Sequence, residues 1–419
     1  MEPGRINESD AERLDRLFRS ESARAIATLA RIFGDFQRAE DAVQEAYIEA
    51  LESWPLQGTP RNPAGWILSV ARNRAIDQVR REKTATKKYD LLARLEGAAI
   101  TDPMMTNDDA IEDDRLAMIF ACAHPALAPE TRVALTLRYA AGLTTEEIAA
   151  AFLVPLATLA QRLVRAKRKI VQSGIPFSVP APAKMPERLG DVLAVAYLVF
   201  NEGYRSSQGG ALVRVDLCRD ALHLTRTLCR LMPGEPELLG LHALMLFHHA
   251  RRATRVNDRG EAAPLEEQDR ERWDVVAIAQ GRAALEEAAR HRHPGPYQLQ
   301  ATIAAAHATA PSWDATDWPG IRRAYDALYA LDPSPVVALN RAVALAFSGE
   351  YDSAMREIDA LLAGPLAGYT PAMIAKADLL RRGGALAEAR GWFERTMPLL
   401  GTAAERAIVE RRIAECATS

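Results

Sequence analysis

The sequence contains few aromatic residues and no long apolar segment. Phe, Trp and Tyr make up 6% of its 419 residues, whereas 26% of the residues are charged. The longest apolar run, Val192 to Phe200, is too short to cross a bilayer, and the N-terminus lacks the apolar centre of a signal peptide. We therefore expect a soluble, cytoplasmic protein that does not act on a membrane.

Cysteine is also rare. The four cysteines are Cys122, Cys218, Cys229 and Cys416. They are widely scattered, and none has the CxxC or Cys/His spacing of a zinc site. The sequence therefore predicts buried free thiols in a reducing compartment.

The histidines do not form a metal-ligand pattern either. The candidates are His248, His249, His291 and His293. No acidic residue stands at ligand spacing from them, and neighbouring arginines would repel a cation. Nucleophile elbows and phosphate-binding loops are absent from the sequence as well, so we predict no metal, no cofactor and no enzymatic activity.

Alternating runs of Val, Ile and Thr, which mark strands, are hard to find. Alanine and aliphatic residues instead recur at helical spacing, so the predicted fold class is all-α. The formal net charge is only −3, which means that any basic surface for a nucleic acid must be local.

Proline-rich and charge-biased gaps divide the helical pattern into three blocks. The first block covers residues 9–95, the second block 115–172 and the third block 187–419. An acidic linker at 96–114 and a proline-rich linker at 173–186 separate them. A chain of this length accommodates several domains, so we expect a modular protein.

The end of the third block contains a repeated motif. The segments GEYDSA and GALAEA begin at Gly349 and Gly384, 35 residues apart, close to the period of ~34 residues in tetratricopeptide repeats. Ser334 followed by Pro335 is typical of the start of a helix. We predict a short array of helical hairpins, although alanine-rich helices can show such spacing by chance.

Residues 144–170 predict a helix-turn-helix. Thr144 and Glu147 form a capping box at the start of a first short helix. On a second helix, apolar residues at i, i+4, i+7 and i+11 form a stripe for packing. The stripe consists of Leu159, Leu163, Ala166 and Ile170. The opposite face carries positive charge with no acid from residue 153 to 170, and it suits phosphates and guanine edges; a solvated basic surface is the alternative.

The segment 118–170 resembles region 4 of bacterial sigma factors of the extracytoplasmic-function group, the region that reads the promoter −35 element. The matching residues are Glu146, Glu147, Ile148, Ala149, Thr158, Arg162, Arg165, Ala166 and Lys167. The resemblance implies −35 DNA contacts by Thr158, Gln161, Arg162, Arg165, Lys167 and Arg168. Ala160 and the Leu156-Ala157 turn depart from the family pattern, which leaves the base preference open.

The helix expected at 39–54 in the first block resembles region 2.2 of the same family. The family motif D-x-x-Q-E is present as Asp41, Gln44 and Glu45, which implies docking on the clamp helices of the largest polymerase subunit. Periodicity places Glu40 with them on one exposed acidic face; an ordinary solvated face is the alternative. The resemblance also implies contact with the flap of the second-largest subunit.

The next helix, NPAGWILSVARNRAIDQVRRE, combines an apolar stripe with amide and guanidinium groups on its other side. Single-stranded DNA needs cations along its backbone and a pocket for an unstacked base. In the family an Asn seven residues after a Trp lies at such a pocket, and Trp66 and Asn73 have this spacing. The resemblance implies base capture by Asn73, whereas Trp66 is expected in the core. Strand contacts are expected from Arg72, Arg74, Arg80 and Arg81.

The resemblance also assigns roles to the linker and the third block. The acidic linker is expected in the polymerase cleft toward the RNA exit path, although a disordered spacer fits the residues equally. The whole layout is similar to the subgroup with a C-terminal tetratricopeptide-like extension. Because helical-repeat arrays bind peptides or domains, we expect the third block to regulate the first two through a protein or peptide partner, by inhibition or by activation.

The sequence thus predicts a sigma factor that binds core RNA polymerase and promoter DNA. One alternative is a repeat-containing helix-turn-helix regulator that is not a sigma subunit. Another is a helical-repeat scaffold that needs neither basic face.

Overall fold

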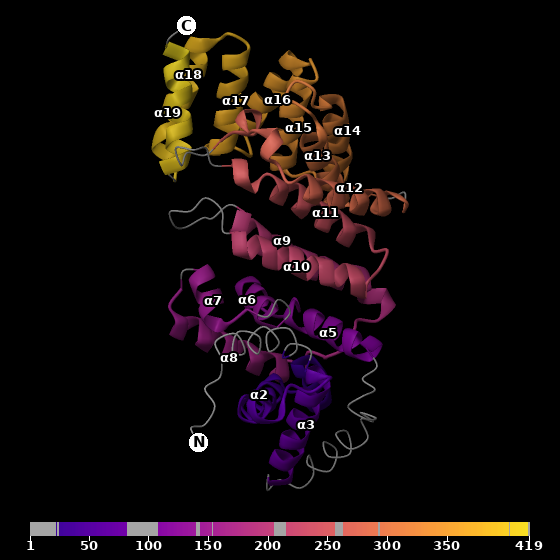
Figure 1. Ribbon diagram of the computed structural model, residues 1–419. Helices are drawn as coiled ribbons and strands as arrows, with labels where there is room; N and C mark the ends of the chain where they lie inside the picture. The colour runs from indigo at the N-terminus through magenta and orange to yellow at the C-terminus, as the bar shows by residue number, and fades with distance from the viewer. Residues whose placement is uncertain are drawn as a thin grey trace. The chain divides into compact units, whose positions relative to one another are not determined.

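The computed structural model describes residues 22, 25–81, 108–139, 143–152, 154–204, 215–255, 263–291, 294–401 and 403–417 (Figure 1). Every regular element in these ranges is a helix, which confirms the all-α prediction. The chain divides into two compact units. The first comprises residues 1–200 and 219–231, and the second comprises 201–218 and 232–419.

The first unit contains the described helices of the first two blocks. These are α2 (Phe36–Gln57), α3 (Pro63–Arg81), α5 (Asp108–Cys122), α6 (Pro129–Tyr139), α7 (Thr145–Ala151) and α8 (Leu156–Gln172). Asp35 caps α2 by accepting hydrogen bonds from the backbone N–H groups of Gln37 and Arg38, and Gly58 ends the helix at a φ of 85°. Antiparallel packing of α2 and α3 brings Trp66 edge-on to the buried Trp54, with ring centroids 5.2 Å apart.

The linkers are shorter than predicted. Residues 108–114 belong to helix α5, and Asp114 is buried and ion-paired with Arg31. Acidic side chains in the first turns of a helix are favourable, because they face the positive end of the helix dipole. The acidic run therefore marks a helix start, and the rest of the predicted acidic linker, residues 96–107, lies outside the described residues.

The proline-rich linker also leads directly into helical structure. It contains a 3-10 turn at Pro182–Lys184 and the first residues of α9 (Met185–Tyr204). Arg188 of α9 donates to the backbone carbonyl of Phe120, and Asp191 pairs with Arg132 of α6 at 3.3 Å. The start of the third block thus packs on the second block, and α10 (Val215–Leu231) completes the described helices of this unit.

The second unit is an array of helices that pack on their neighbours in sequence. It contains α11 (Pro236–Ala250), α12 (Val275–Ala289), α13 (Pro296–Thr309), α14 (Trp318–Leu331), α15 (Pro335–Phe347), α16 (Tyr351–Ala363), α17 (Thr370–Arg382), α18 (Leu386–Thr396) and α19 (Ala403–Ala417). Each of α13, α14 and α15 packs on the helix that follows it, and so do α17 and α18. This arrangement confirms the predicted helical-hairpin array.

The repeated motif corresponds to a repeated turn. Gly349 precedes α16 and Gly384 precedes α18, and both have positive φ angles, of 96° and 83°. Only glycine adopts this conformation without strain, which explains the residue at both positions. Ser334 caps α15 by accepting from the N–H of Val337, with Pro335 at the first helical position, as predicted.

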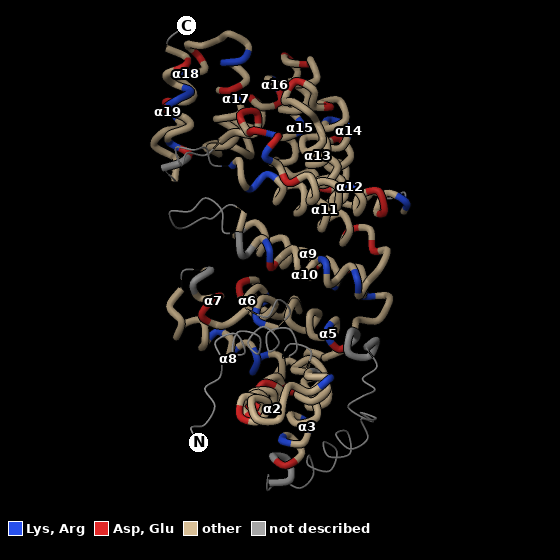
Figure 2. The backbone as a smooth tube through the Cα atoms, viewed as in Figure 1, with Lys and Arg blue, Asp and Glu red and all other residues tan. Residues whose placement is uncertain are grey.

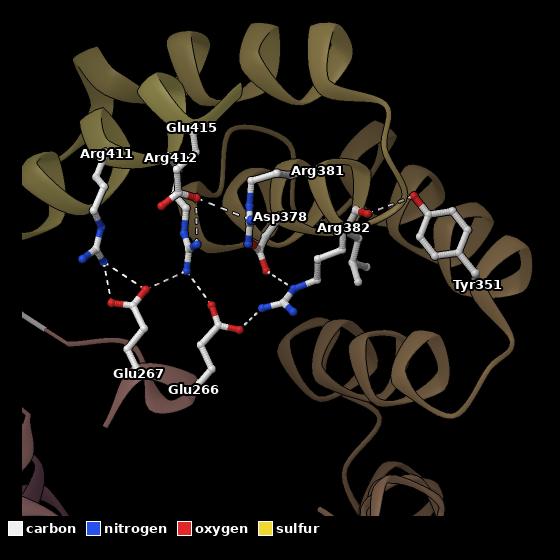
Figure 3. A network of polar contacts seen from close by, with 10 residues as sticks. Glu266, Glu267, Tyr351, Asp378, Arg381, Arg382, Arg411, Arg412 and Glu415 are labelled. Atoms are coloured by element: carbon white, nitrogen blue, oxygen red, sulfur yellow. Dashed lines mark hydrogen bonds and ion pairs between the residues drawn. The ribbon is translucent and has the colours of Figure 1, made fainter. Parts of the chain in front are cut away.

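The connection between α11 and α12 is tied to the end of the array by carboxylates (Figure 3). Glu267 accepts from Arg411 at 2.8 Å and from Arg412 at 3.1 Å, and Glu266 accepts from Arg412 at 2.5 Å and from Arg382. We call residues 263–274 the strap. Glu266 and Glu267 contact residues more than a hundred positions later, so the strap links the connection between α11 and α12 to α17 and to the last helix, α19.

Among the residues that the structure describes, no helix is both long enough and apolar enough to span a bilayer.

Candidate nucleic-acid and polymerase interface

Helix α8 presents one buried face and one polar face. Leu159, Leu163, Ala166 and Ile170 are at most 5% exposed, as the spacing predicts. The predicted DNA-contacting residues that lie exposed are Thr158, Gln161, Arg162, Arg165 and Arg168. Helix α8 contains no acidic residue, and its basic residues, coloured blue in Figure 2, all lie between Arg162 and Lys169. The positive part of the exposed face therefore begins after the first turns of the helix.

The preceding helix is fixed by the capping box. The N–H of Thr144 donates to Glu147 Oε2 at 2.7 Å, and the N–H of Glu147 donates to Thr144 Oγ1 at 3.1 Å. Ile148 and Ala149 are buried, and α7 packs on α8. The two helices therefore form the helix-turn-helix that the sequence predicts, with its second helix facing outward.

A hollow of about 500 Å³ lies between the polar face of α8 and the start of α6. Arg162, Arg165 and Lys169 line one side, and Glu130 and Thr131 line the other. Lys169 is exposed as well, and helical spacing places it on the same outward face, four residues after Arg165.

Lys167 differs from the other predicted DNA contacts. Its side chain is only 11% exposed, and its Nζ lies 2.8 Å from Glu40 Oε2 on α2. The prediction that Lys167 faces DNA is therefore not met in this conformation. The lysine lies at the edge of the polar face nearest the buried stripe, where α2 of the first block can reach it.

Glu40 is buried rather than exposed, which corrects the prediction from periodicity. Its carboxylate accepts from Arg138 at 3.2 Å, from the Tyr139 hydroxyl at 3.0 Å and from Lys167. Burial alone would raise the pKa of Glu40, but Lys167, Arg138 and the hydroxyl together bring it below its ordinary value. The phenol remains neutral as a donor, because burial and the nearby carboxylate raise the pKa of Tyr139.

The remaining acidic face of α2 is accessible. Gln44 and Glu45 are exposed, whereas Asp41 is half-buried and accepts from the Gln37 side chain at 2.7 Å. All three lie within the first three turns of α2. The structure thus leaves the predicted polymerase-docking motif open on the helix that holds Glu40.

Helix α3 carries the predicted −10 residues. Asn73 is exposed, Arg72 is half-buried, and Arg74 donates to Glu49 of α2 at 2.8 Å. The contact with Glu49 raises the pKa of Arg74. Arg80 and Arg81 belong to the last turn of α3, but their side chains lie outside the described residues.

The described part of the chain contains no group of three or more His, Cys, Asp or Glu side chains arranged to hold a metal ion. Burial raises the pKa of Cys122, so this thiol stays protonated. His293 lies outside the described residues.

Comparisons with known proteins agree with this geometry. A model of sigma-70 region 2 matches residues 17–85, and a model of sigma-70 region 4 matches residues 117–170. A further family of unknown function, DUF6596, matches residues 188–289.

Some relatives match nearly the whole chain, and others match only part of it. An uncharacterized protein of Rhizobium meliloti (strain 1021) is 40% identical over 407 residues, covering 97% of this chain and 96% of the relative. The ECF RNA polymerase sigma factor SigK of Mycolicibacterium vanbaalenii is 28% identical over 39% of this chain and 84% of its own length. The probable ECF sigma factor SigI of Mycobacterium tuberculosis is 29% identical over 41% of this chain and 59% of its own length.

The chain belongs to the extracytoplasmic-function group of the sigma-70 family. Region 2 of this sigma factor includes α2 and α3, and region 4 includes α6, α7 and α8. The DUF6596 match begins in α9 and ends in α12, so it extends from the first unit into the second.

Sequence reasoning missed the residues that join regions 2 and 4 of the sigma factor. Arg138 and Tyr139 end α6, and no local pattern of residues indicates that they contact α2. Phe36 of α2 packs against both Tyr139 and Phe177, with centroids 4.8 Å apart in each case. Aromatic residues with helical spacing predict a core, but they do not identify the partner.

Proposed function

We propose that this sigma factor binds core RNA polymerase through the acidic face of α2 and directs initiation from promoters read by α8 and α3. The supporting observation is the exposed face of α8. It carries three arginines, Gln161 and Thr158, no acid, and an outward orientation fixed by the capped α7. Arginine recognises guanine edges and phosphates, and the amide and hydroxyl groups add donors and acceptors for bases.

Region 2 supplies the other two activities in this proposal. Asp41, Gln44 and Glu45 dock on the clamp helices, and Asn73 holds an unstacked base of the −10 strand. Arg72, Arg74, Arg80 and Arg81 contact the strand backbone, for which Arg74 exchanges its bond to Glu49 for a phosphate. Region 4 contacts the flap of the second-largest subunit. The protein acts in the cytoplasm as a transcription factor and performs no chemistry of its own.

Transcription reconstituted with bacterial core polymerase tests the proposal. Purified protein and core enzyme are combined with a library of upstream regions from the source genome, and transcripts are sequenced. We expect specific transcripts that disappear in the Asp41→Arg, Glu45→Arg double variant and persist in Glu52→Arg, a matched change at an exposed position on α2. DNA binding without any binding to core polymerase would overturn the proposal in favour of a helix-turn-helix regulator.

A separate variant tests the role of the C-terminal array. The array presents packed helical hairpins of the kind that bind peptides or domains, so we propose that it regulates transcription by regions 2 and 4. A chain that ends at Leu231 keeps every described helix of the first unit. Increased transcription from this chain would indicate inhibition by the array, decreased transcription would indicate activation, and unchanged transcription would remove the regulatory role.

A further inference from the structure

The contact between Glu40 and Lys167 joins the two helices that have the most different proposed partners. Glu40 immediately precedes Asp41 on the polymerase-docking helix, and Lys167 belongs to the DNA-reading helix. The ammonium lies 2.8 Å from the carboxylate, and the exposed fraction is 11% for the lysine side chain and 9% for that of Glu40. The pair therefore lies inside an interface and is not a surface ion pair.

Other groups complete this interface. Arg138 and the Tyr139 hydroxyl hold the same carboxylate, and the ring of Tyr139 packs on Phe36, one helical turn before Glu40. Four polar groups thus satisfy one another beside an aromatic cluster. Such geometry specifies one arrangement of two elements, whereas its net contribution to stability is small because desolvation offsets much of the attraction.

We propose that Glu40 is a latch that holds region 4 against region 2 in the free sigma factor and keeps Lys167 from DNA until core polymerase docks on α2. This inference rests on the proposed function. A single ammonium with so little exposure cannot bind a phosphate while it binds Glu40, so the two contacts of Lys167 exclude each other.

The positions of the docking residues set the order of events. Gln44 and Glu45 are exposed while the latch is closed, so the clamp can bind first. Asp41 is adjacent to Glu40, so docking there changes the surroundings of the latch. The carboxylate loses the lysine, which then becomes available to the promoter, and region 4 is free to move to its own element.

Amine labelling of the full-length protein tests the latch without DNA. An amine-reactive ester is applied briefly, and modification of individual lysines is measured by mass spectrometry. Lys169 lies on the same helix and is exposed, so it serves as an internal reference. We expect Lys167 to react about tenfold more slowly than Lys169 in the free protein, and nearly as fast in the Glu40→Gln variant. Glu52→Gln, an exposed change on the same helix, should leave the ratio unchanged.

Adding core polymerase to the wild-type protein tests the opening step and needs no variant. We expect the reactivity of Lys167 to rise toward that of Lys169. Equal reactivity in the free wild-type protein, or slow reaction of Lys167 that persists in Glu40→Gln, would overturn the latch. If Lys167 reacts faster in Glu40→Gln but its reactivity in the wild-type protein does not change when core polymerase is bound, then polymerase does not control the latch. Labelling of the free chain involves neither polymerase nor promoter. The labelling result can therefore contradict the latch while the transcription assay supports the sigma activity, and it can support the latch while that assay contradicts the sigma activity.

Discussion

Thr144 and Glu147 each accept a hydrogen bond from the backbone N–H of the other, at 3.1 and 2.7 Å. This reciprocal pair closes the first turn of α7, a helix of only seven residues that supports the recognition helix. A helix this short has little stability of its own, so the cap contributes a large share of it.

Removing the cap should loosen α7 selectively. We expect Thr144→Ala to cost about 1 kcal/mol, since the N–H of Glu147 loses its acceptor. Amide exchange in α7 should accelerate about fivefold, as measured by hydrogen-exchange mass spectrometry. Thr144→Ser retains the hydroxyl and should exchange at nearly the wild-type rate. Equal acceleration in both variants would show that the methyl contact, and not the hydrogen bond, stabilises the turn.

Local patterns predicted the parts of this protein that depend on near neighbours. The capping box, the buried stripe of α8 and the Ser334 cap all follow from residues within a few positions of one another. Glu40 was predicted on the wrong face because its partner Lys167 lies 127 residues away, and helical periodicity contains no information about that partner. The acidic run before Asp114 was misjudged for a different reason: the same residues that fit a flexible linker also suit the start of a helix.

The Tyr139 hydroxyl should stabilise the interface between regions 2 and 4. Tyr139→Phe keeps the ring that packs on Phe36 but removes one donor from the buried Glu40 carboxylate. We expect a loss of roughly 1–2 kcal/mol, because hydrogen bonds to charged groups exceed neutral ones in strength. Denaturant unfolding followed by circular dichroism measures the change. Tyr329→Phe, in the second unit, removes the hydroxyl of a half-buried tyrosine without affecting Glu40 and serves as the control.

Neutralising the strap should release α19. Arg412 is 9% exposed and is held by Glu266, Glu267 and Glu415. The double variant Glu266→Gln, Glu267→Gln leaves its guanidinium with one carboxylate, and we expect a cost of roughly 1–3 kcal/mol. Hydrogen exchange should accelerate in α19 before it does in α13. Glu271→Gln changes an exposed carboxylate of the same strap and should not accelerate exchange in α19. Equal acceleration in Glu271→Gln and in the double variant would contradict the role of the ion pairs.

His307 should make the second unit sensitive to mild acid. Burial, together with the guanidinium groups of Arg251 and Arg270, lowers its pKa to about 4. Well above pH 6.5 the imidazole is neutral in both the folded and the unfolded state, so its titration does not change the stability there. As the pH falls from 6.5 toward 4, the unfolded chain gains a proton that the folded chain does not, and stability decreases by up to about 3 kcal/mol.

The His307→Phe variant isolates this effect from the titration of carboxylates. Phenylalanine keeps a ring beside Trp313 and Trp318 but cannot accept a proton. The difference in unfolding free energy between wild type and variant should therefore shift in favour of the variant between pH 6.5 and 4.5. A difference independent of pH would show that His307 titrates normally in the folded protein.

Two glycines of the array should respond to alanine in opposite directions. Gly349 has a φ of 96°, and a Cβ there would contact nothing within 4 Å, so the cost of Gly349→Ala is that of the backbone conformation alone. We expect about 1–2 kcal/mol of destabilisation. Gly391 lies inside helix α18, where an added Cβ also meets open space. Because alanine loses less chain entropy than glycine in a helix, Gly391→Ala should stabilise by roughly 0.5–1 kcal/mol. Thermal unfolding of the two variants measures both signs. A lower Tm in Gly391→Ala as well as in Gly349→Ala would contradict the prediction. It would mean that the added methyl group is not accommodated in the space around α18.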